Sequence, residues 1–110
     1  HKTALGAEDT VDWKYFKDTL EAVSELKEKG YKVYSVEQVE GSTMLNKLEI
    51  DENKKYAVIM GNEVKGVKQE VVNASDGCIE IPQFGTKHSL NVSVTAGIVV
   101  WEFARLLMKL

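Results

Sequence analysis

The chain has few of the features that mark secreted, membrane-spanning or metal-binding proteins. It contains one cysteine, Cys78, so no internal disulfide can form, and a reducing compartment such as the cytoplasm is expected. No run of about 18 apolar residues predicts a transmembrane helix, and the first residues lack the apolar core of a signal peptide. The two histidines, His1 and His88, are far apart and belong to no metal-ligand cluster. We therefore expect neither a membrane nor a metal among the partners.

A large excess of charge is also lacking. The 14 Lys and Arg residues oppose 17 Asp and Glu residues, and the net charge of −3 argues against broad, non-specific nucleic-acid binding by the chain as a whole. With 110 residues, 44% hydrophobic and 28% charged, the composition is that of one globular domain and not of a disordered chain.

Apolar, strand-like runs alternate with segments of helical periodicity along the chain. This alternation predicts an α/β fold with a mainly parallel sheet flanked by helices. The run 56–60 is apolar throughout and predicts a central strand covered on both faces. Gly30 is suited to end the first helix, and Pro82 to stop the last strand. The expected elements are an extended segment over 11–16, a helix over 18–30, a strand over 31–36, a helical turn within 42–48, the strand over 56–60, a helix over 67–74, a strand over 78–81 and a helix from about 89 to 109.

The last of these helices is apolar around most of its circumference. Residues such as Val94, Ile98, Val99, Trp101 and Phe103 cannot all face one core, so the helix is expected to be buried on more than one side. A homodimer formed through this C-terminal helix would supply the second side. A sheet that wraps over the helix is the alternative.

Two polar segments follow predicted strand ends, where open α/β sheets place their ligands. The first is Gly61-Asn62-Glu63-Val64-Lys65-Gly66, whose glycines permit positive φ and close backbone approach. It lacks the Gly-Lys-Ser/Thr of a P-loop and the spacing of a dinucleotide-binding loop. The pattern is compatible with a plain turn as well as with a ligand loop.

The second segment runs from Ile81 to Val94 and leads into the last helix. Ser89 and Asn91 stand at the expected helix start, where their side-chain oxygens can cap free N–H groups. Capping does not explain the further small polar groups within this apolar helix. Such groups need hydrogen-bond partners, which a bound ligand or an opposing backbone could supply.

These residues resemble two motifs of a known family. Met60-Gly61-Asn62-Glu63-Val64-Lys65-Gly66 is similar to the second motif of the SpoU (TrmH-like) branch of the SPOUT RNA methyltransferases. Ile81-Pro82-Gln83-Phe84-Gly85, followed by Ser89-Leu90-Asn91-Val92-Ser93-Val94, is similar to their third motif. The family's Leu-Gly-Ala segment occurs at Leu5-Gly6-Ala7, so the resemblance covers essentially the whole chain.

The resemblance implies a fold, a cofactor and a site. The fold is the SPOUT α/β domain with a C-terminal trefoil knot, in a protein that acts as a homodimer. The cofactor is S-adenosyl-L-methionine, and the implied binding residues are Gly61, Asn62, Ile81, Pro82, Gln83 and Leu90. The positions that match the polar residues of the active site are Glu63, Ser89 and Asn91. Gln83 stands where the family usually has Met, which changes one pocket wall and leaves the backbone contacts in place.

The implied reaction is methyl transfer to a ribose 2′-hydroxyl of tRNA or rRNA, without a metal. The family's first motif, with an Asn and an Arg, precedes the Leu-Gly-Ala segment, and the only arginine here is Arg105. Residues 1–110 are therefore expected to be one domain that forms the C-terminal part of a catalytic domain. Its N-terminal strands would be missing, and it would be inactive alone. The alternative is a non-catalytic RNA-binding or dimerisation module with the same fold.

Overall fold

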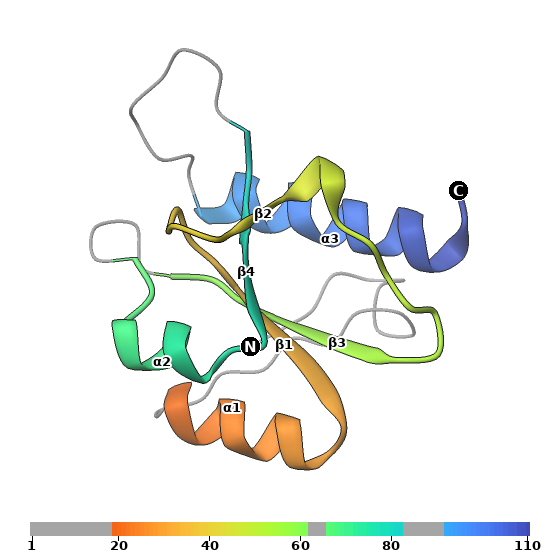
Figure 1. The fold of residues 1–110 in the computed structure, drawn as a ribbon. Coiled ribbons are helices and arrows are strands. Elements are labelled where there is room, and N and C mark those ends of the chain that lie inside the picture. Colours follow the sequence, from red (N-terminus) through yellow and green to blue (C-terminus); the bar gives the residue numbers. More distant parts are fainter. Residues whose placement is uncertain (1–18, 62–65, 83–91) are drawn as a thin grey trace.

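A computed structural model describes residues 19–61, 66–82 and 92–110, which form a four-stranded sheet between two layers of helices (Figure 1). The predictions for 11–16, Asp18 and the start of the last helix near Ser89 lie outside these residues. The elements are α1 (Thr19–Glu28), β1 (Tyr31–Val36), β2 (Thr43–Met44), the 3-10 helix η1 (Leu45–Lys47), β3 (Lys55–Ile59), α2 (Gln69–Ala74), β4 (Gly77–Glu80) and α3 (Val92–Met108).

The strands are ordered β2-β4-β1-β3, and every pair is parallel. The mainly parallel sheet predicted from the alternation of strands and helices is thus confirmed. Strand β1 has the predicted bounds. Gly30 ends the preceding helix segment with a φ of +89°, in the left-handed region predicted for it. The turn predicted within 42–48 is the short strand β2 followed by η1.

Strand β3 differs from its prediction in one respect. Its side chains alternate between two apolar clusters: Tyr56 and Val58 pack on one face of the sheet, and Ala57 and Ile59 on the other. Both faces are therefore covered, as predicted. Among the described strands, however, β3 pairs only with β1 and lies at the end of the order, so the predicted central position is not found. An apolar run indicates that both faces of a strand are covered. It does not indicate whether the strand has hydrogen-bonded neighbours on both edges.

Each face of the sheet has its own core. On one face α3 and the η1 region bury a cluster that consists of Leu45, Leu48, Ile79, Val99 and Phe103. On the other face α1 and α2 bury Val23, Val33 and Val71 (Figure 1). Ile79 and Val33 have no exposed surface, and each fully buried aliphatic side chain contributes about 1.5–3 kcal/mol of transfer free energy.

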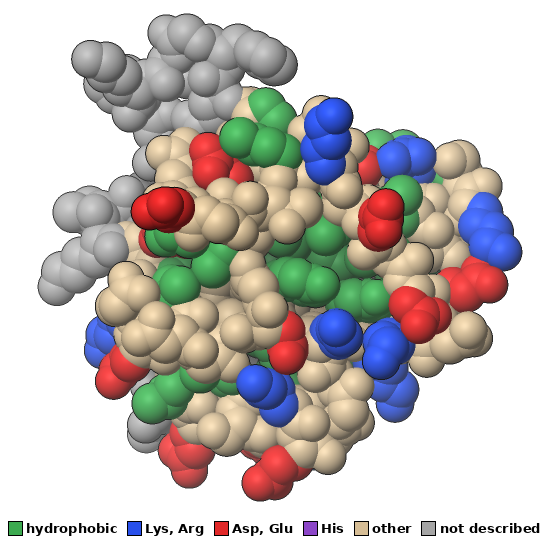
Figure 2. Space-filling model, viewed as in Figure 1, with side chains coloured by type: hydrophobic (Ala, Val, Ile, Leu, Met, Phe, Trp, Pro, Cys, Tyr) green, Lys and Arg blue, Asp and Glu red, His purple; other side chains and the backbone are tan. Residues whose placement is uncertain are grey.

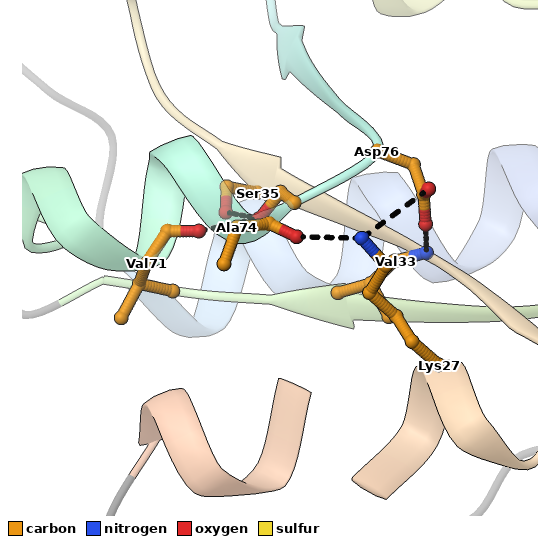
Figure 3. Close-up of polar contacts among 7 residues, drawn as sticks. Lys27, Val33, Ser35, Val71, Ala74 and Asp76 are labelled. Atoms are coloured by element: carbon orange, nitrogen blue, oxygen red, sulfur yellow. Dashed lines mark hydrogen bonds and ion pairs between the residues drawn. The ribbon is translucent and has the colours of Figure 1, made fainter. Parts of the chain in front are cut away.

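A polar network joins α1, α2 and β1 at the amino end of β4 (Figure 3). Asp76 accepts a hydrogen bond from the Val33 N–H through Oδ2, at 2.7 Å, and its own N–H donates to the Val33 carbonyl at 2.7 Å. Lys27 Nζ donates to the Ala74 carbonyl at 3.1 Å and lies 3.8 Å from Asp76 Oδ1. Asp76 thus extends the pairing of β4 with β1 by one residue and satisfies an otherwise orphaned N–H.

A buried pair of hydroxyls extends this network toward α2. Ser75 Oγ donates to the Val71 carbonyl at 2.8 Å, and the Ser75 and Ser35 Oγ atoms lie 2.6 Å apart. Because the Ser75 proton points at Val71, Ser35 is the donor of the pair. The fully buried Ser35 hydroxyl therefore has a partner and connects the end of α2 with the next-to-last residue of β1.

We predict that Asp76→Ala lowers the free energy of unfolding by about 1–3 kcal/mol, because it leaves the Val33 N–H without an acceptor. Lys27→Ala is the matched control: it removes only an exposed ion pair and an exposed hydrogen bond, and should cost less than about 1 kcal/mol. Urea unfolding followed by circular dichroism measures both. Equal, small losses in the two variants would contradict the role assigned to Asp76.

Candidate functional site

Parallel pairing brings the carboxyl ends of β1, β3 and β4 to one edge of the sheet. The register aligns Ser35 with Ile59 and Val36 with Ile79, so the three strands end nearly level. Glu37 directly follows β1, Gly61 follows β3 after one residue, and Ile81 and Pro82 directly follow β4. We call these four residues the carboxyl edge. Since β1 lies between β3 and β4, Gly61 and Ile81 flank the end of β1. The structure therefore brings together three residues predicted to bind cofactor, Gly61, Ile81 and Pro82, all half-buried.

The remaining predicted site residues lie outside the described part of the chain. These are the cofactor residues Asn62, Gln83 and Leu90 and the active-site residues Glu63, Ser89 and Asn91. Their attachment points are described, because Gly61 and Gly66 bound one segment, and Pro82 and the start of α3 bound the other. Their roles stay predictions.

Gly61 and Gly66, the two glycines of the segment that resembles the family's second motif, lie close together. A Cβ on Gly61 would overlap the backbone of Gly66 and Val67. Gly66 has a φ of +69°, in the left-handed region, and a Cβ there would overlap the carboxylate of Glu37. Both positions therefore require glycine for steric reasons, and the backbone of Gly61 lies against that of Gly66 and Val67.

Glu37 is a residue of this edge that the sequence did not single out. Its Oε2 accepts a hydrogen bond from the Val67 N–H at 2.9 Å, and its Oε1 accepts one from the Gln38 N–H at 3.1 Å. Its own N–H donates to the Ile79 carbonyl at 3.1 Å, which extends the pairing of β1 with β4. The available signal was an acidic residue directly after a buried strand. Its partner Val67 is 30 residues away, which no local pattern reveals.

Two further polar groups lie on β4 beside this edge. Burial raises the pKa of the Cys78 thiol above its ordinary value, and the negative charge of Glu37 raises it further. Ser42 Oγ donates to Glu80 Oε1 at 2.7 Å and so ties the start of β2 to the end of β4. The charged side chains at the described ends of β1 and β4, Glu37 and Glu80, are both acidic.

A separate groove of about 290 Å³ lies near the amino halves of β1 and β3. It is lined by Lys32, Tyr34, Glu49, Ile50, Asp51, Lys54 and Tyr56. Figure 2 shows apolar side chains in the middle of this face of the molecule, framed by acidic and basic ones. The groove contains none of the predicted site residues and lies at the other end of the strands from the carboxyl edge.

Two absences hold for the described ranges. Within residues 19–61, 66–82 and 92–110, no three His, Cys, Asp or Glu side chains lie close enough to hold a metal ion. None of the helices in those same ranges is both long and apolar enough to cross a membrane.

Helix α3 presents an exposed stripe that consists of Val94, Ile98, Trp101 and Met108. These side chains are 52, 38, 59 and 49% exposed, and their spacing places them on one face of the helix, opposite the buried Val99 and Phe103. The sequence predicts that this helix is buried on more than one side. In the described structure only the side with Val99 and Phe103 is covered, and burial of the second side stays a prediction.

Comparisons with known proteins agree with this geometry. The tRNA (guanosine(18)-2′-O)-methyltransferase of Thermus thermophilus is 36% identical over 109 residues, which cover 99% of this chain and 55% of that protein. The 23S rRNA (guanosine-2′-O-)-methyltransferase RlmB of Neisseria meningitidis is 34% identical, over 94% of this chain and 40% of that protein. The crystal structure of a TrmH/SpoU tRNA modifying enzyme of A. aeolicus matches with a TM-score of 0.74 and 31% identity, over 86% of this chain and 47% of that one.

The chain therefore spans about half the length of the relatives that it matches. The model of the SpoU rRNA Methylase family matches residues 1–101, nearly the whole chain, and confirms the resemblance that the two motifs carry. This chain belongs to the SpoU rRNA Methylase family.

Proposed function

We propose that this chain forms the cofactor-binding part of an S-adenosyl-L-methionine-dependent methyltransferase that modifies a ribose 2′-hydroxyl of tRNA or rRNA. The observation that carries the proposal is the carboxyl edge, where the two family motifs follow β3 and β4, the parallel strands that flank β1. The tRNA and 23S rRNA 2′-O-methyltransferases among the relatives support both substrate classes.

The described residues fit this cofactor in two ways. Gly61, Ile81 and Pro82 offer half-buried backbone and apolar surface, which suits an adenine ring and a ribose. Glu37 and Glu80 are carboxylates, and a phosphate-bearing nucleotide would meet repulsion there. S-adenosyl-L-methionine has no phosphate, and its sulfonium is positively charged, so an acidic edge is compatible with it.

In the reaction, S-adenosyl-L-methionine supplies an electrophilic methyl group on its sulfonium sulfur. We assign the orientation of the cofactor to the backbone at Gly61, Ile81 and Pro82, since alignment of the reacting atoms is a large part of such a step. The ribose hydroxyl is a poor acid, so its proton must be accepted or its developing charge stabilised. Glu63, Ser89 and Asn91 are the side chains proposed to contact that hydroxyl.

The proposal includes several features implied by the family. The catalytic domain would contain additional N-terminal strands with the first motif, and residues 1–110 would be its C-terminal part. The C-terminal segment would thread a preceding loop to form the trefoil knot. The enzyme would work in the cytoplasm, where its RNA substrates are, and would need no metal.

We predict that the protein in its full natural length binds S-adenosylhomocysteine in calorimetry and methylates tRNA or rRNA with labelled S-adenosyl-L-methionine. Ser89→Ala and Asn91→Ala should each lower turnover about a hundredfold, because they remove groups at the reacting hydroxyl. Ser24→Ala, in the exposed surface of α1, is the control and should keep full activity. The 110-residue chain alone should transfer no methyl group.

Failure to bind S-adenosylhomocysteine at millimolar concentration would overturn this proposal. RNA binding without cofactor binding would favour the alternative, a non-catalytic module with the same fold. Turnover by the 110-residue chain alone would show that the first motif is not required.

We also propose that the exposed stripe of α3 is covered by a second copy of the chain in a homodimer. The stripe is apolar, and the opposite face of the same helix is already buried in the core, so we assign the cover of the stripe to a partner from outside this chain. Arg105 does not add an unpaired charge beside it: Nε and Nη2 donate to Glu102 at 3.0 and 2.7 Å, and this pairing lowers the pKa of Glu102. A self-complementary, neutral stripe fits an isologous contact.

We expect Trp101→Glu to make the protein monomeric, because a charge at the centre of the stripe would be buried without a partner in the dimer. Light scattering after gel filtration measures the mass, and circular dichroism checks that the variant stays folded. Lys47→Glu, a change at an exposed residue of η1 that is not part of the stripe, is the control and should remain dimeric. A wild-type protein that stays monomeric at about 100 µM, a concentration well above that needed by a dimer of micromolar affinity, would contradict the proposal.

A further inference from the structure

We propose that Glu37 is a positioning residue of the cofactor site: its carboxylate holds the base of the loop between Gly61 and Val67 against the end of β1. This inference rests on the function proposed above, because it assigns to Gly61 a role in cofactor binding. It concerns a residue that lies in neither of the two family motifs.

The backbone of Glu37 is held in place by the sheet. It follows the last residue of β1, a strand paired on both sides, and its N–H donates to the Ile79 carbonyl of β4. The backbone of Glu37 is therefore part of the hydrogen-bonded sheet, and only its side-chain torsions are free to vary. A carboxylate mounted in this way can fix the position of a less regular segment.

The carboxylate in turn binds the backbone of Gly66 and Val67, at the base of the loop. Oε2 accepts the Val67 N–H at 2.9 Å, and Oε1 accepts the Gln38 N–H at 3.1 Å, so both oxygens are engaged by backbone donors. Hydrogen bonds to an ionised acceptor are roughly twice as strong as neutral ones. Gly66 packs directly on the carboxylate with positive φ, and a side chain there would displace it.

The third contact links the backbone that Glu37 holds with Gly61, which is predicted to bind the cofactor. Gly61 lies against the backbone of Gly66 and Val67 so closely that a Cβ would overlap it. Glu37, the pair Gly66–Val67 and Gly61 thus form three successive layers without intervening side chains. If the first layer is removed, the base of the loop is no longer held, and Gly61 loses its fixed distance from Ile81 and Pro82 across the end of β1.

The chemistry of the side chain explains why a carboxylate suits this position. A glutamate presents two acceptor oxygens to two N–H donors. A glutamine of the same shape presents one acceptor and one NH₂ group, and the NH₂ group would face a backbone donor. An alanine presents neither acceptor. We therefore expect Glu37→Ala to weaken cofactor binding more than Glu37→Gln does.

The test uses the protein in its full natural length with Glu37→Gln, Glu37→Ala and the control Glu40→Gln. Glu40 is exposed three residues further on, so its substitution makes the same change in charge away from the loop. The Kd for S-adenosylhomocysteine and the KM for S-adenosyl-L-methionine should rise about tenfold in Glu37→Gln and more in Glu37→Ala. At saturating cofactor kcat should stay within about twofold of wild type, because Glu37 does not contact the reacting atoms. Glu40→Gln should match wild type.

A second measurement needs no ligand. Hydrogen exchange of the Val67 amide, followed by NMR, should be slow in wild type and in Glu40→Gln, and clearly faster in Glu37→Ala. Faster exchange with unchanged cofactor affinity would overturn the positioning role. A fall in kcat with unchanged KM would overturn it too, since Glu37 would then act on the chemical step. If exchange of Val67 responds as expected but wild type binds no S-adenosylhomocysteine, it is the proposed function that fails, and the contact itself stands.

Discussion

Strand β1 is hydrogen-bonded in parallel on both sides, to β3 from Tyr31 to Ser35 and to β4 from Tyr34 to Val36, and the candidate site depends on this pairing. Parallel strands end at a common edge, so segments that are distant in sequence leave the sheet next to one another. Gly61 and Ile81 meet the end of β1 for this reason alone. An antiparallel arrangement of the same strands would send one of the two motifs to the opposite end of the sheet.

Two groups of contacts along β1 have different physical roles. Beside the amino end of β4, Asp76 accepts the Val33 N–H that the strand ladder leaves open, Lys27 donates to the last carbonyl of α2, and Ser35 connects β1 with the end of α2. These contacts hold the elements together. At the carboxyl end of β1, Gly66 adopts a left-handed conformation against the Glu37 carboxylate. This contact constrains the backbone beside the candidate site.

The sequence predicted local features well and pairings across the chain less well. Strand β1 has the predicted bounds because Gly30 ends the preceding helical segment and because β-branched and aromatic residues are frequent in the strand. The location of Gly61 and Ile81 at one edge follows from parallel alternation and was predictable as well. Two features were not. The position of β3 in the strand order depends on its neighbours, which an apolar run does not specify. The role of Glu37 depends on the Val67 N–H, which reaches it only after β1 and β3 have paired.

Helix α3 connects the two parts of the proposed function. Its buried face, with Val99 and Phe103, packs against the sheet core that contains Ile79 of β4, and its first residue directly follows Asn91. The helix therefore fixes the point at which the chain enters the described structure after Asn91, just as β4 fixes the point from which Ile81 and Pro82 follow. A partner that covers the exposed stripe would clamp α3 from its second side and restrict its motion relative to β4. In the proposed dimer α3 would be held on both faces, so we expect loss of the dimer to weaken the site even where no site residue crosses the interface.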